Sequence, residues 1–119
     1  MFRAANGAVP LVDWLKELEE PEPRAYRKCL ERILHLSNLG SELRRPLADM
    51  LRDGIRELRM KVGTVNYRIL YFFCGSHVVC LSHGFTKEGE VPDAEIETAL
   101  RRRKLVEKDI DKYTADWEV

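Results

Sequence analysis

Five charged residues lie within or beside three short apolar segments in the second half of the sequence. Glu57, Arg59 and Lys61 alternate with apolar residues, which places all three on one face of a strand. Arg68 interrupts the next apolar segment, where a charged side chain needs a partner or a ligand. Arginine offers a phosphate two parallel donors and lysine offers a movable charge. The pattern predicts a phosphate site that Lys87, just past the third segment, would close. The alternative is a structural ion pair between Arg68 and Glu57.

Two other groups of polar residues favour structural roles. Cys74, His77, Cys80 and His83 recur every three residues, like four metal ligands. Successive strand residues alternate between faces, so Cys80 points away from both histidines, and we expect no metal site. The basic run at 101–104 fans around a helix with acidic residues at i, i+4 spacing, which favours a solvated helix face over a nucleic-acid site. No motif for nucleotide binding, a serine hydrolase or a zinc protease occurs, and no cofactor is expected.

The elements that must position these residues are indicated by hydrophobic periodicity. Apolar residues at i, i+3, i+4 and i+7 predict a helical hairpin early in the chain, and a period of two then predicts an antiparallel meander. A final helix begins at Pro92. The predicted elements are helices at about 9–20 and 23–39, strands at about 57–62, 65–73 and 77–85, and a helix to about 109. Residues 1–8 should form at most a weak strand, and residues 114–119 should fray. The expected fold is α+β, with the helical hairpin on one sheet face and the active cleft on the other.

Composition narrows the possible functions. The chain has 119 residues with 20 basic and 20 acidic side chains, which fits one domain over residues 1–119 without an overall field toward nucleic acid or membrane. The charge is segregated, however, because residues 24–68 hold 11 basic and 5 acidic side chains, a net charge of +6. No membrane-spanning segment or signal peptide is evident, so the expected location is the cytoplasm. Three cysteines, an odd number, favour small core residues over a disulfide framework.

Four segments of the sequence carry a resemblance to a known family. A glycine at 54 precedes Glu-Leu-Arg at 57–59, Tyr-Arg-x-x-Tyr follows at 67–71, Gly-Phe-Thr-Lys at 84–87, and Pro-Asp-Ala-Glu-Ile at 92–96. In this order and spacing the chain resembles the RelE/ParE superfamily, closest to its HigB and phage-derived branch. The resemblance covers roughly residues 9–109. Glu88 stands where the family has a second lysine, and Val91 where it has a helix-capping threonine.

The resemblance implies the toxin of a bacterial type II toxin–antitoxin pair, a ribosome-dependent endonuclease that cuts messenger RNA. The implied partners are a helix-turn-helix antitoxin, the ribosome and the message. The family's basic positions fall on Arg59, Lys61, Arg68 and Lys87, which are the expected catalytic residues. The expected substrate contacts are Glu57, Tyr71 and His83, although the aromatic run at 71–73 favours the core. The alternatives are a ParE-like inhibitor of DNA gyrase and an inactive fold that binds its antitoxin.

Overall fold

The protein begins with two antiparallel helices, as the sequence predicts. The structure, a computed structural model, describes residues 1–75 and 78–117. Helix α1 spans Pro10–Glu19 and helix α2 spans Pro23–Leu39, each with proline in its first turn. Gly40 ends α2 at a φ of 55°, a conformation that favours glycine, and its N–H bonds to the Leu36 carbonyl. A short 3₁₀ turn follows at Gly40–Glu42.

A four-stranded antiparallel sheet follows in the order β1-β2-β3-β4. The strands are β1 at Ala48–Arg52, β2 at Ile55–Val62, β3 at Val65–Cys74 and β4 at Val78–Thr86. The predicted meander is confirmed for β2 to β4, with Ser76 and His77 outside the described residues. Strand β1 was not predicted. It pairs with β2 through a register that shifts between Met50 and Arg52.

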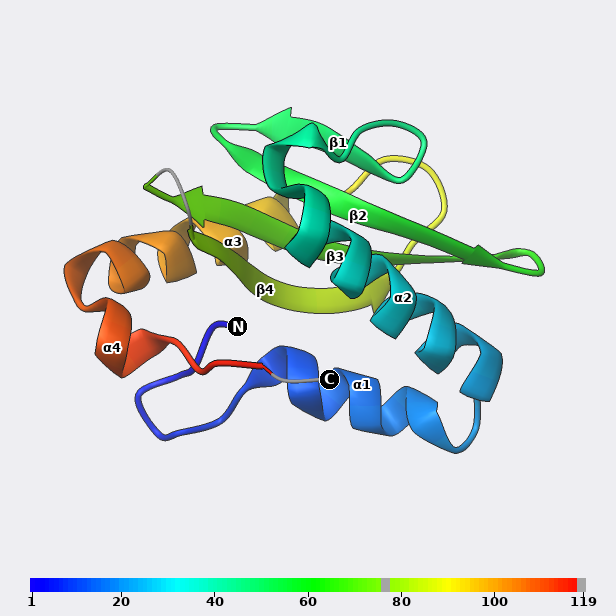
Figure 1. The fold of residues 1–119 in the computed structure, drawn as a ribbon, viewed down its shortest axis with the longest axis horizontal. Coiled ribbons are helices and arrows are strands. Elements are labelled where there is room, and N and C mark those ends of the chain that lie inside the picture. Colours follow the sequence, from blue (N-terminus) through cyan, green and yellow to red (C-terminus); the bar gives the residue numbers. More distant parts are fainter. Residues whose placement is uncertain (76–77, 118–119) are drawn as a thin grey trace.

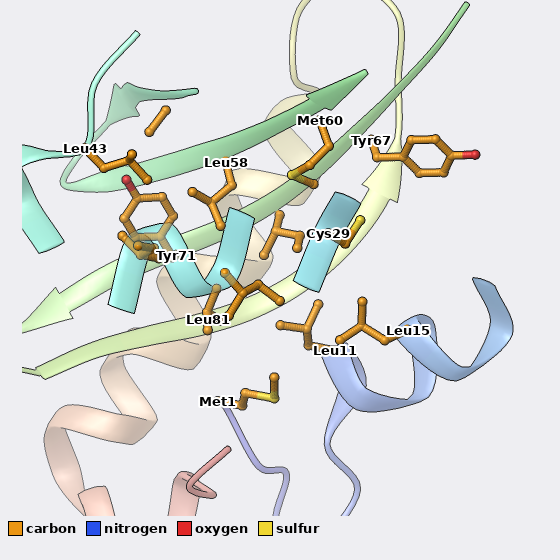
Figure 2. Close-up of a cluster of buried hydrophobic side chains, with 14 of the residues drawn as sticks. Met1, Leu11, Leu15, Cys29, Leu43, Leu58, Met60, Tyr67, Tyr71 and Leu81 are labelled. Carbon is orange, nitrogen blue, oxygen red and sulfur yellow. The ribbon is translucent and has the colours of Figure 1, made fainter. Parts of the chain in front are cut away.

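The sheet is covered on both faces. Figure 1 shows α2 crossing one face while α3, which spans Asp93–Lys108, lies behind the strands. Leu58, Met60 and Ile69 pack with the two N-terminal helices in the larger core, part of which Figure 2 shows. A second core lies between the sheet and α3. It comprises Phe2, Ile55, Leu70, Phe72, Cys80, Ile96, Ala99 and Val106. The face opposite the helical hairpin is therefore only partly available for a cleft.

The two ends of the described chain lie side by side. Phe2 forms an isolated antiparallel bridge with Thr114, and the Met1 and Ala115 backbones exchange hydrogen bonds of 2.8 and 2.9 Å. The weak strand expected in residues 1–8 is confirmed as this single bridge. The expected fraying is wrong for 114–117, because backbone pairing fixes this segment after the short helix α4 at Ile110–Tyr113. Within the described residues, no helix combines the length and the apolar character needed to cross a membrane.

A candidate phosphate-binding site on the sheet

Glu57 holds two arginines together at the centre of the site. Its side chain lies on β2 and is about 1% exposed. Arg59 Nε donates to Glu57 Oε1 at 2.6 Å, and Arg68 Nη1 donates to Oε2 at 3.1 Å. Arg59 and Arg68 face each other across β2 and β3, where like charges alone would repel. The carboxylate therefore offsets this repulsion and fixes the spacing of the two guanidinium groups.

Each arginine has a second anchor that brings in another part of the chain. Arg59 Nη2 donates to Asp49 Oδ2 at 3.0 Å, and Asp49 comes from the unpredicted strand β1. The ion pair with Arg45 lowers the pKa of Asp49. Arg68 Nη2 donates to the carbonyl oxygen of Gly89 at 2.6 Å, which ties the segment between β4 and α3 to the sheet. Arg59 remains 41% exposed, so this guanidinium is accessible to a ligand.

Two lysines lie at the same end of the sheet as the arginines. Lys61 pairs in register with Asn66, and the backbone N–H of Lys87 donates to the Asn66 carbonyl at 3.2 Å. Both lysines are exposed, and within the described residues neither forms an ion pair. The predicted alternation is confirmed, because Glu57, Arg59, Lys61 and Arg68 share the sheet face that points away from the helical hairpin. Sequence reasoning treated an ion pair with Glu57 and a phosphate site as alternatives. The structure contains the ion pair within a cationic cluster.

Tyr71 and His83 do not lie as substrate contacts would. Tyr71 is fully buried among core side chains on the helical-hairpin face, as Figure 2 shows, so its assignment to the site is corrected to a core role. His83 shares the face of the cluster, but its side chain is only 13% exposed. Its Nδ1 lies 2.8 Å from Ser82 Oγ and its Nε2 lies 3.7 Å from Glu95 Oε1. Burial, assisted by Arg102, lowers the pKa of His83 to about 4. A neutral imidazole against α3 indicates a structural role.

The basic run on α3 is less solvated than expected. Arg102 is half-buried, lies 4.9 Å over the Phe2 ring and donates to the Ser82 carbonyl at 3.3 Å. Arg103 bonds to the Asp53 carbonyl and pairs with Glu107 at 3.4 Å. These two arginines attach α3 to the sheet, whereas the neighbours at 101 and 104 are exposed. Across residues 1–75 and 78–117, no three histidine, cysteine or acidic side chains form a group suited to a metal ion.

Sequence reasoning missed one buried cation, Arg32 on α2. It is 6% exposed and donates from Nη1 to the Arg59 carbonyl at 2.9 Å. The signal was its position, since Arg32 falls three residues after Cys29 and four before Leu36 on the apolar stripe of its helix. A charged residue at such a position needs a reason. Strand β1 is the other omission, because it supplies Asp49.

Comparison with known proteins places this site within a family. The model of the family described as "Phage derived protein Gp49-like (DUF891)" matches residues 13–104. The curated relatives include the proteins named "Probable endoribonuclease HigB1" from Mycobacterium tuberculosis strains CDC 1551 / Oshkosh and ATCC 25618 / H37Rv. Each is 36% identical over 104 residues, which cover 87% of this chain and 80% of the relative. The chain belongs to the phage-derived Gp49-like family, and with it to the HigB-like branch of the RelE/ParE-type toxins.

Proposed function

We propose that this protein is the toxin of a type II toxin–antitoxin pair and that it cleaves messenger RNA on the ribosome. The observation that carries the proposal is the pair of arginines held by Glu57 beside two exposed lysines. The relatives' printed name, probable endoribonuclease, supports the same activity. The proposed partners are a helix-turn-helix antitoxin, the ribosome and the message, and the proposed location is the cytoplasm.

The chemistry would be attack of an RNA 2′-hydroxyl on the adjacent phosphate. Negative charge then develops on the non-bridging oxygens and on the leaving 5′-oxygen, and fixed cations stabilise it without reorganising. Arg59 and Arg68 are suited to the non-bridging oxygens, because Glu57 and the Gly89 carbonyl hold their guanidinium groups in place. The Lys61 and Lys87 ammonium groups are the candidate proton donors to the leaving oxygen.

Glu57 is less suited to the role of general base. A base must reach the 2′-hydroxyl directly or through one water. Both carboxylate oxygens of Glu57 already accept bonds from arginines, and its side chain is about 1% exposed. We therefore propose Glu57 as a positioning residue. Ribosome dependence follows from the lack of a well-placed base, because the ribosome would hold the message in an attack-ready geometry.

The decisive experiment measures cleavage of end-labelled message during translation, with DNA gyrase supercoiling measured in parallel. Arg68→Ala and the Arg59→Ala/Arg68→Ala double variant should lose cleavage and relieve growth arrest while circular dichroism shows them folded. Arg56→Ala is the matched control, since Arg56 lies on the same strand but stacks at 5.2 Å on Phe73 of the other face.

Each result has a distinct meaning in this experiment. Unchanged arrest by folded Arg68→Ala would remove Arg68 from the mechanism. Equal cleavage of naked and ribosome-bound message would contradict ribosome dependence. Inhibition of supercoiling with intact message would favour the gyrase inhibitor, and the absence of both activities would favour an inactive antitoxin-binding fold.

A further inference from the structure

Arg32 replaces a missing strand at the open edge of β2. Strand β1 pairs with β2 from Arg52 back to Ala48, and the last contact beyond it is the Arg59 N–H bonded to the Leu47 carbonyl at 2.8 Å. The Arg59 carbonyl lies at the end of this ladder and accepts from Arg32 Nη1 instead. This bond explains why a polar group lies on the inner side of α2. It uses only one of the five N–H donors of the guanidinium group.

The charge of Arg32 is not compensated within the protein. No carboxylate in residues 1–75 and 78–117 lies within ion-pair distance of Arg32, and its buried Nε has no hydrogen-bond partner. Burial lowers the pKa of Arg32, which shows the same unfavourable environment. A buried charge without a partner is costly, and a bound anion would remove that cost.

Arg32 lines a cavity whose charged residues are all cationic. The cavity has a volume of about 320 Å³, roughly the space of ten water molecules. It lies between α2 and the end of β2, and no acidic residue lines it. Its five cationic residues come from α2, β2 and β3, and they are Lys28, Arg32, Arg59, Lys61 and Arg68. The two helix residues thus extend the positive charge of the proposed catalytic cluster around the sheet edge.

We propose that this cavity is a phosphate subsite for the substrate strand, in which Arg32 and Lys28 bind a backbone phosphate next to the one at Arg59 and Arg68. The inference rests on the proposed function in one respect, because the nuclease proposal identifies the strand as RNA. Arg32 supplies the fixed contact, with its remaining donors held in place by the bond to the Arg59 carbonyl. Lys28, half-buried one turn earlier on α2, supplies a movable charge.

The test is binding of a short 2′-O-methyl RNA, which cannot be cleaved because its 2′-oxygens are blocked. The dissociation constant should rise about tenfold in Arg32→Gln and severalfold in Lys28→Gln, as expected for loss of a charge-assisted hydrogen bond. The slope of log K against log salt should also fall by about 0.7 per lost phosphate contact. Arg27→Gln is the matched control, because Arg27 is exposed on the same helix and does not line the cavity. It should bind like the wild type.

Further arms separate the remaining explanations. Lys28→Gln keeps the bond between Arg32 and the Arg59 carbonyl, so it tests the subsite even when Arg32→Gln fails to fold. Wild-type affinity in folded Lys28→Gln, or an equal loss in Arg27→Gln, would overturn the proposal. Inorganic phosphate that competes fully at the concentration of the RNA would also overturn it, because the site would then serve a free anion. Cleavage without any effect of Lys28 or Arg32 on binding refutes the subsite alone, whereas Arg32-dependent binding without cleavage refutes the nuclease alone.

Discussion

Replacing Glu57 with glutamine should destabilise the fold because it leaves two arginines without their shared carboxylate. Removing one partner of a buried ion pair costs about 3–5 kcal/mol, whereas an exposed pair is worth about 0–1 kcal/mol. Arg68 is 13% exposed and belongs near the first case, while Arg59 at 41% belongs nearer the second. We therefore expect Glu57→Gln to lower the free energy of unfolding by about 3 kcal/mol.

Urea denaturation at pH 7 measures this loss. With a slope of about 1.5 kcal/mol per M, the midpoint should fall by about 2 M. Asp49→Asn is the matched control, because Asp49 also accepts from Arg59 but pairs only with partly exposed arginines. The control should lose less than about 1 kcal/mol. A Glu57→Gln variant no less stable than Asp49→Asn would refute the conclusion that Glu57 neutralises both arginines.

Three further predictions concern residues outside the site. His83, whose pKa falls from 6.5 unfolded to about 4 folded, should stabilise the protein above pH 6.5. That contribution, about 3 kcal/mol, should be lost as pH falls from 6.5 to 4; a wild-type minus His83→Asn difference in urea midpoints that stays constant over this range would contradict it. Gly84→Ala should cost more than about 2 kcal/mol, because its Cβ would overlap the Trp14 indole. Thermal unfolding should show a smaller loss in a Trp14→Leu background, and equal losses would refute the overlap. Burial raises the pKa of Cys29 to about 12 and of Cys80 to about 11, so neither should react with a thiol reagent at pH 8 until urea unfolds the chain.

Local patterns were sufficient to predict the helices, the meander and one face of the site. The alternation of Glu57, Arg59 and Lys61 fixes their face as soon as β2 forms, and Arg68 joins them by pairing in register with Arg59. The same alternation, applied to β3, places Tyr71 on the opposite face. The resemblance to the family outweighed that pattern and led to the wrong role for Tyr71.

The missed features depend on contacts distant in sequence. Strand β1 is five residues long, contains Asp49 and Arg52, and is stabilised by pairing with β2 rather than by its own composition. The cavity beside Arg32 arises only when α2 packs on the end of β2. Periodicity reports which face of an element is apolar, but it does not report which tertiary hydrogen bond makes a charged residue acceptable there.

The bond from Arg32 to the Arg59 carbonyl also bears on how this sheet avoids associating with other chains. Free N–H and C=O groups at a sheet edge can pair with a strand of another molecule. Here a side chain occupies an acceptor on β2 where β1 ends, and the Phe2 N–H occupies the Leu81 carbonyl on the outer edge of β4. The irregular register of β1 further interrupts a continuous edge. These contacts disfavour edge-to-edge aggregation of a chain whose strands are rich in apolar and aromatic residues.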